Sequence, residues 1–396
     1  MRYLHVISSL NPEGGGPAEG VLRLTSASLR QGHDVEIATL DAPGAAWNHN
    51  LPGVVHSLGP PRLGSYAYSS QLLRWLGRHA SSYQAVVVHG LWQHHGFAVQ
   101  QALHGTNTPY FVFAHGMLDP WFKRTYPLKH LKKLLYWPWA EYRVLRDAHG
   151  VLFTCEQERL LARESFRLYR AREVISPFGA SPPEGDPQRQ RAAFLRAYPE
   201  LAGRRILLFL GRIHPKKGCD LLIEAFAQLA ADNPDLHLVM AGPDATGWRV
   251  ALQARAEALG LQRLTWTGML TGDLKWGALR AAEAFVLPSH QENFGVAVAE
   301  ALSVGVPVLI SREVNIAREI DDAGAGLVAA DNLAGTTELL QRWLHLDKFA
   351  KQRMSRNGLQ LFQSRFHIDA AAQALVQVMQ ERIAPAPLLR IATAAP

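Results

Sequence analysis

The stretch LPSHQENFGVAVAEALSVGVPVLIS, residues 287–311, places Glu292 and Glu300 between two apolar segments. The segments 284–289 and 307–311 have the composition of buried strands. We predict a strand, a loop, a helix that begins near Phe294, and a second strand. Glu292 then lies in the loop and Glu300 lies about two turns into the helix, roughly 12 Å further along the axis.

Two carboxylates at this separation cannot act on one atom, but they can hold the two ends of an elongated, polyhydroxylated ligand. Backbone N–H groups of Phe294 and Gly295 at the helix start can meet a phosphate between them. The alternative places Glu300 on a solvated helix surface. Its neighbours on both sides, Ala299 and Ala301, are apolar, and a buried carboxylate without a partner is costly.

Strand-like and helix-like segments alternate on both sides of a linker rich in Pro, Gly and Ser, residues 176–188. This alternation predicts an α/β protein with two doubly wound, Rossmann-like domains. Ligands of such sheets bind outside the carboxyl ends of the strands. The expected strands are 3–10, 34–40, 85–90, 110–116 and 150–155 in the first half, and 205–211, 236–242, 264–268, 284–289 and 307–311 in the second.

Two segments at expected strand ends can bind anions. Arg212 and Lys217, in GRIHPKKG (211–218), supply cations beside a helix start and suit a diphosphate; the alternative is a solvated basic turn. The glycine-rich segment 13–20 can bring backbone amides close to a ligand, although a tight turn explains it equally well. Its spacing is not that of the dinucleotide-binding fingerprint.

A third candidate is His115, which ends the segment 110–116 on the ligand-binding side of the sheet. A structural histidine is the alternative. His89, His94 and His95 lie near a neighbouring strand end, but their spacing matches no zinc site, and we expect no bound metal.

The bulk composition adds weaker indications. The net charge is +7, which favours solubility, an anionic ligand or an anionic surface. Two cysteines suggest a reducing compartment, and we find neither a signal peptide nor a transmembrane segment. We therefore expect a cytoplasmic protein that can associate with the inner face of the cell membrane.

The segment 121–143 interleaves basic and aromatic residues, and its leucines at 128, 131, 134 and 135 have helical spacing. One hypothesis is that this segment docks on anionic lipid, where a lipid-linked acceptor would present its sugar. The alternative is an amphipathic helix packed on the sheet.

Together, GRIHPKKGCDLLIEAF, PSHQENFGVAVAEAL, the glycine-rich first loop and the His-Gly strand end resemble the retaining glycosyltransferases of family 4, of the bacterial polysaccharide type. The resemblance spans about residue 3 to about residue 380, and implies the GT-B fold, with two domains facing each other across a cleft. The domains would be 1–178, on the acceptor side, and 179–368, which binds the nucleotide-sugar. A helix 369–383 would cross back to the first domain, ahead of a flexible tail, 384–396.

The resemblance also implies residue roles. Glu292 would hold sugar hydroxyls, Glu300 the ribose, and His115 would lie beside the donor sugar. Arg212 and Lys217 would bind the diphosphate. The remaining implied donor-site residues are Gly15, Gly16, Asn293, Phe294, Gly295 and Val296. One departure is SPFGA (176–180), where many members have Pro-Asn-Gly.

The implied reaction transfers a hexose, with retention and without a metal or other cofactor, from a UDP- or GDP-sugar. The acceptor would be a saccharide or polyprenyl-linked sugar of exopolysaccharide, O-antigen or glycolipid synthesis. Two alternatives are a nucleotide-sugar epimerase or hydrolase on the same fold, and a non-enzymatic, basic nucleic-acid-binding protein. The second leaves the Glu292–Glu300 segment unexplained, and we expect no nucleic-acid partner.

Overall fold

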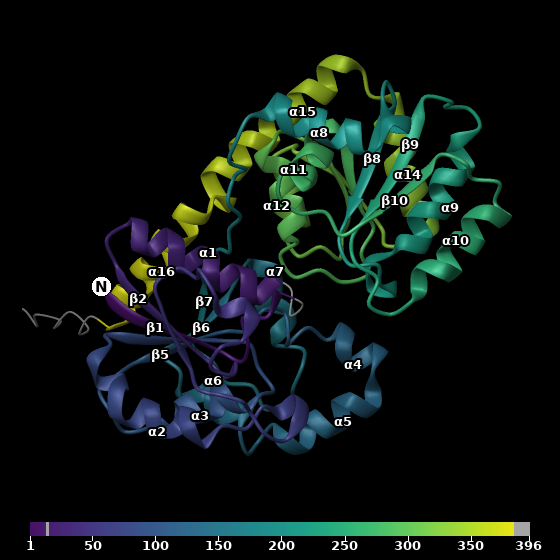
Figure 1. Cartoon of the computed structure of the whole chain (residues 1–396). Coiled ribbons are helices and arrows are strands. Elements are labelled where there is room, and N and C mark those ends of the chain that lie inside the picture. Colours follow the sequence, from purple (N-terminus) through teal and green to yellow (C-terminus); the bar gives the residue numbers. More distant parts are fainter. Residues whose placement is uncertain (13–15, 384–396) are drawn as a thin grey trace, which may run out of the picture.

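The computed structural model describes residues 1–12 and 16–383, which form two α/β lobes (Figure 1). Every strand pair within the two sheets is parallel. The first sheet has the order β3-β2-β1-β4-β5-β6-β7. Its strands are β1 Arg2–Ile7, β2 Asp34–Thr39, β3 Val54–Ser57, β4 Ala85–His89, β5 Tyr110–Phe113, β6 Gly150–Phe153 and β7 Glu173–Ile175.

The second sheet has the order β10-β9-β8-β11-β12-β13, which again reverses direction in the middle of the sheet. Its strands are β8 Arg205–Leu210, β9 Leu236–Ala241, β10 Leu264–Gly268, β11 Ala282–Leu287, β12 Val308–Ser311 and β13 Gly326–Ala329. In doubly wound sheets, the point of reversal is where ligands bind. In the second sheet this point lies between β8 and β11.

Helices cover both faces of the sheets, as in the second lobe, where α8 and α11 lie on one side and α9 and α10 on the other (Figure 1). In the first lobe the helices are α1 Gly16–Arg30, α2 Ser70–His79, α3 His94–Leu103, α4 Trp121–Thr125, α5 Pro127–Tyr136, α6 Glu141–Asp147 and α7 Glu156–Ala162. Those that follow are α8 Pro187–Ala197, α9 Cys219–Ala230, α10 Trp248–Ala258, α11 Gly272–Ala281, α12 Val296–Ser303, α13 Ala317–Asp322, α14 Leu333–His345, α15 Lys348–Leu361 and α16 Ile368–Ile383.

The last helix, α16, leaves the second lobe and packs against α1 of the first (Figure 1). Its buried residues Leu375 and Met379 belong to the same hydrophobic cluster as Tyr3 and Leu24 of the first lobe. The cluster also includes the core of the second lobe, so apolar packing is continuous between the lobes. The predicted GT-B arrangement, with its crossing C-terminal helix, is therefore confirmed.

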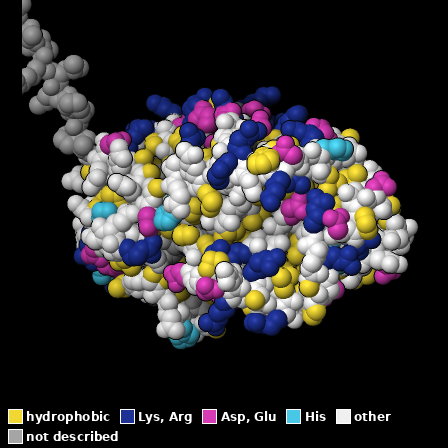
Figure 2. Space-filling view, turned by 90° about the horizontal axis from the view of Figure 1, so that it is seen from above, with side chains coloured by type: hydrophobic (Ala, Val, Ile, Leu, Met, Phe, Trp, Pro, Cys, Tyr) yellow, Lys and Arg dark blue, Asp and Glu magenta, His cyan; other side chains and the backbone are white. Residues whose placement is uncertain are grey.

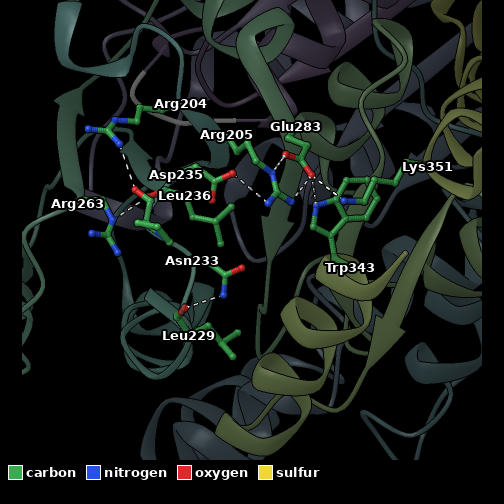
Figure 3. Close-up of polar contacts among 11 residues, drawn as sticks. Arg204, Arg205, Leu229, Asn233, Asp235, Leu236, Arg263, Glu283, Trp343 and Lys351 are labelled. Carbon is green, nitrogen blue, oxygen red and sulfur yellow. Dashed lines mark hydrogen bonds and ion pairs between the residues drawn. The ribbon is translucent and has the colours of Figure 1, made fainter. Parts of the chain in front are cut away.

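The amino edge of the second sheet is fixed by a partly buried polar cluster around Glu283, the second residue of β11 (Figure 3). The Glu283 carboxylate accepts hydrogen bonds from Arg205, from the Trp343 indole at 3.1 Å and from Lys351 at 2.9 Å. Burial opposes ionisation of Glu283, but these donors still lower its pKa. The cluster stabilises the sheet at the edge remote from the predicted site.

Sequence reasoning located ten of the strands but did not predict β3, β7 or β13. All three lie at the edges of their sheets, and β3 and β7 contain no fully buried residue, so they lack the buried apolar run that identified the other short strands. The helix predicted to start near Phe294 begins two residues later, at Val296, after Gly295. Glu300 is therefore little more than one turn into the helix. The predicted tail, 384–396, lies outside the described residues.

None of the helices in the described ranges combines the length and the apolar character that crossing a bilayer requires.

Candidate active site between the two sheets

Residues that follow β5 in the first lobe contact residues that follow β11 in the second. Gly116 has φ +71°, and a Cβ built there would lie 2.8 Å from Cβ of Asn293. Any side chain at position 116 would therefore push the lobes apart. His115, immediately before it, also has a positive φ, of 49°, which is uncommon for a residue with a side chain. The backbone thus turns sharply where the two lobes meet.

A buried carboxylate, Glu158 on α7, holds this turn. Its oxygens accept hydrogen bonds from N–H of Gly116 at 2.6 Å and from N–H and Oγ1 of Thr154 at 2.6 and 2.7 Å. Burial raises the pKa of Glu158 despite these donors. Asn293 of the second lobe donates to Oγ1 of Thr154 at 3.3 Å, so the network spans the cleft.

On the second lobe, Lys217 forms an ion pair with Glu292, and both side chains are largely buried. Lys217 comes from the loop after β8 and Glu292 from the loop after β11. These loops meet because Gly218, at φ +65°, approaches the backbone: a Cβ there would lie 2.2 Å from the Pro288 carbonyl oxygen. The two predicted donor-site segments are therefore adjacent, at the point where the sheet reverses.

This corner of the second lobe is cationic. Burial lowers the pKa of Lys217 to about 7, with smaller contributions from Lys216 and Arg212, while the adjacent Glu292 carboxylate acts in the opposite direction. Burial also lowers the pKa of Lys216 to about 8. Arg212 is exposed at the same loop. An anion would relieve the repulsion among these cations.

Glu300 lies at the other end of the segment, where it is buried with its side chain 4% exposed. The structure resolves the alternatives for this residue, because Glu300 is neither solvated nor alone. Its carboxylate pairs with Arg23 of α1 at 2.8 Å and with Lys275 of α11 at 2.9 Å. Arg23 comes from the first lobe, so this ion pair also joins the lobes.

Aromatic rings line the space between these two ends. Phe294 is buried and contacts Phe178 edge-on, with ring centroids 5.7 Å apart. Phe178 in turn lies edge-on to His115 at 5.6 Å. Phe178 belongs to the segment 176–180, where this sequence differs from the Pro-Asn-Gly of many family members. Its ring lies between two predicted site residues, His115 and Phe294. A small cavity beside it is lined by Gly16, Glu19, Gly20, Arg23, Phe178, Gly179 and Val296.

The structure therefore brings most of the predicted residues to one interface between the lobes. Gly15 lies outside the described residues. Arg23, Lys275 and Glu158 were missed, because each lies on a helix whose local sequence gives no sign of a site. Among residues 1–12 and 16–383, no group of three His, Cys, Asp or Glu side chains is arranged to hold a metal ion.

Comparison with protein families agrees with this geometry. A model described as "Glycosyl transferase 4-like domain" matches residues 15–179, and one described as "Glycosyl transferases group 1" matches residues 191–360. Together they cover both lobes. The chain belongs to the glycosyltransferases of family 4 with the GT-B fold.

Individual relatives are similar but distant. The alpha-D-kanosaminyltransferase of Streptomyces kanamyceticus is 29% identical over 61% of this chain, a match that spans 63% of that enzyme, less than two thirds of its length. A GDP-mannose-dependent phosphatidylinositol dimannoside mannosyltransferase of Mycobacterium tuberculosis is 25% identical over 91% of this chain and 92% of its own length. The structure of Anabaena HepE with UDP-glucose is 18% identical, with a TM-score of 0.72 over 96% of this chain and all of HepE, and supports the fold.

Proposed function

We propose that this protein is a retaining hexosyltransferase that uses a UDP- or GDP-hexose donor. The observation that carries the proposal is the pairing of Lys217 with Glu292 at the reversal point of the second sheet. Glu300 follows on the same segment, about one turn into α12. A nucleotide-sugar has negative charge at its centre and hydroxyl groups at both ends. Cations flanked by two carboxylates complement that pattern.

The roles follow from position. Lys217 and Arg212 would stabilise the diphosphate as it leaves, and Glu292 would accept hydrogen bonds from sugar hydroxyls. Glu300 would accept from the ribose, sharing its carboxylate with Lys275. A phosphate oxygen of the donor would take the acceptor's proton on the same face of the sugar, which retains the anomeric configuration. Neither a metal ion nor another cofactor takes part in this scheme.

Relatives support a donor and an acceptor of this kind. The mycobacterial relative is named for GDP-mannose and for a phosphatidylinositol dimannoside, and HepE was solved with UDP-glucose. We propose a saccharide or polyprenyl-linked acceptor in the synthesis of exopolysaccharide, O-antigen or glycolipid. The comparisons favour neither the epimerase or hydrolase alternative nor the nucleic-acid-binding one.

The proposal is tested by screening UDP- and GDP-hexoses for release of nucleoside diphosphate, with and without lipid-linked and free saccharide acceptors. We expect release that depends on the acceptor, a product with the donor's anomeric configuration, and unchanged rates in chelator. Release at the same rate without acceptor would instead indicate a hydrolase. Loss of activity in chelator, restored by a divalent cation, would contradict the metal-free scheme.

We also propose that the protein works at the cytoplasmic face of the membrane, through α5. Leu128, Leu131, Leu134 and Leu135 are 78%, 56%, 44% and 71% exposed, so the helix does not pack its leucines on the sheet. Lys129 and Lys132 are exposed on the same helix. Exposed leucines beside lysines suit the surface of an anionic bilayer.

The distribution of charged side chains on one face of the molecule does not favour a nucleic-acid partner. On the face seen in Figure 2, Lys and Arg side chains are interspersed with acidic and apolar ones. A nucleic-acid-binding surface normally gathers its basic groups in one stripe or patch.

A further inference from the structure

Three histidines form a chain of hydrogen bonds from the core of the first lobe to the cleft. Nδ1 of His5 on β1 lies 2.8 Å from Nε2 of His89 on β4. Nδ1 of His89 lies 3.0 Å from Nε2 of His115, just beyond β5. His5 and His89 are buried, and His115 is partly exposed at the cleft. The chain exists because β1, β4 and β5 are neighbours in the sheet.

All three imidazoles are neutral at physiological pH. Burial lowers the pKa of His5 to about 3 and that of His115 to about 4, and it holds the pKa of His89 well below its ordinary value. A neutral imidazole has one N–H and one lone pair. The hydrogens of a neutral chain must therefore all point the same way, either toward the cleft or toward the core.

The inner end of the chain decides between these directions. Nε2 of His5 is buried and has no hydrogen-bond partner among the described residues. If the hydrogens pointed toward the core, this nitrogen would carry an unpaired N–H in an apolar interior. Orphaned buried N–H donors are rarer than orphaned acceptors. If the hydrogens point toward the cleft, Nε2 of His5 carries only a lone pair without a donor.

We propose that His5 and His89 are positioning residues that hold His115 as its Nδ1–H tautomer. His89 then donates to Nε2 of His115, and Nδ1 of His115 offers an N–H to the cleft. Among the described residues, the His115 side chain makes a hydrogen bond only through Nε2, so its Nδ1–H is available to a ligand oxygen. Given the proposed function, the ligand oxygen is a hydroxyl of the donor sugar. His115 serves as a neutral hydrogen-bond donor and has no lone pair to act as a base there.

The ring environment keeps His115 in the required orientation. Its ring stacks on Phe113 with centroids 5.4 Å apart, and lies edge-on to Phe178. His89 also stacks on Phe113, at 5.3 Å. Rotation of either imidazole would disturb these contacts, so packing fixes the orientations of the rings, while the unpartnered Nε2 of His5 decides the direction of the hydrogens.

The test is a side-chain ¹⁵N–¹H correlation spectrum of the full chain with labelled histidine at pH 7, with His115 assigned from His115→Gln. We expect a proton on Nδ1 of His115 and none on Nε2. In His89→Phe the donor is lost, and we expect His115 to change to the Nε2–H tautomer that free histidine prefers. In His89→Asn the carboxamide can still donate from near the position of Nδ1, and the Nδ1–H tautomer should persist.

Activity gives a second readout. His89→Phe should lower kcat/KM for the donor about tenfold, as expected for one hydrogen bond, and His89→Asn should restore most of it. An Nε2–H tautomer of His115 in the wild type would overturn the inference, as would an unchanged spectrum in folded His89→Phe. If His89→Phe does not fold, the wild-type spectrum alone decides. An Nδ1–H signal in a protein without transferase activity would refute the proposed function and leave this inference standing.

Discussion

Lys217 and Glu292 neutralise each other's charge at the candidate site. Each side chain is largely buried, and each would be costly without the other. A donor that brings its own diphosphate and hydroxyls can engage both partners separately. Removing either side chain should therefore affect catalysis far more than removing one side chain of an exposed ion pair.

We expect Glu292→Ala and Lys217→Ala each to lower transfer by about 10²-fold or more, because each removes an electrostatic contact to the reacting donor. Release of nucleoside diphosphate measures the effect, and circular dichroism checks the fold. The control is Glu338→Ala, which removes the exposed helix pair with Arg342 at 3.2 Å. Near-wild-type rates in folded Glu292→Ala would show that the site is elsewhere.

The lowered pKa of Lys217 gives a pH prediction. Below about pH 7 the amine is charged and can bind a diphosphate, and above its pKa the charge is lost. The profile of kcat/KM, which reports the free enzyme, should therefore fall on the alkaline side, at or above pH 7 since Glu292 favours the charged form. Lys217→Arg should shift the fall to higher pH, because arginine stays protonated. A wild-type profile that stays flat to pH 9 would contradict this assignment.

At the scale of elements, α5 is divided between two roles. Pro127 begins the helix and the following leucines face solvent. Lys133 is different: its ammonium lies over the Trp92 ring at 4.3 Å, and burial lowers its pKa to about 8. Trp137, just after the helix, stacks on Phe166 in the core. The helix is thus anchored by one lysine and one tryptophan, while Lys129 and Lys132 are exposed.

We expect the protein to co-sediment with anionic vesicles at low salt, and Lys129→Glu with Lys132→Glu to abolish this binding. Each basic group near such a surface contributes about 1 kcal/mol. The matched control is Arg191→Glu with Arg196→Glu, which makes the same change in net charge on exposed positions of α8. Equal loss in both variants would indicate a general charge effect, and no binding by the wild type would remove the membrane from the proposal.

At the scale of the molecule, α16 joins the lobes chiefly by apolar packing. Its ion pair from Asp369 to Arg30 has both side chains about half exposed, and such pairs contribute little. Leu375 is fully buried in the cluster that the lobes share.

Leu375→Ala should therefore lower the free energy of unfolding by about 2–5 kcal/mol, and Arg30→Ala by less than about 1 kcal/mol. Urea denaturation measures both, followed by tryptophan fluorescence. The reverse order of effects would mean that the lobes are joined by charge rather than by packing.

The sequence by itself determined the α/β class and the two-domain plan, and it supplied most of the candidate residues in the second lobe. These features are local: apolar runs, turn residues and the charged loops at strand ends all occur within a few positions of one another. The segments 211–218 and 287–311 could each be recognised without knowing what they touch. Strands β3, β7 and β13 could not, because they lie at the edges of the sheets, and which strands form an edge is decided by the fold.

Only the tertiary structure decided which distant residues complete the site. Arg23 reaches Glu300 across 277 positions, and His5 reaches His89 across 84. The first contact depends on how the lobes meet and the second on the order of strands in the first sheet, and no local pattern encodes either. The same holds for α5, whose leucine spacing did not show whether the leucines pack on the sheet. The structure shows that they are exposed, because burial is a property of the folded chain as a whole.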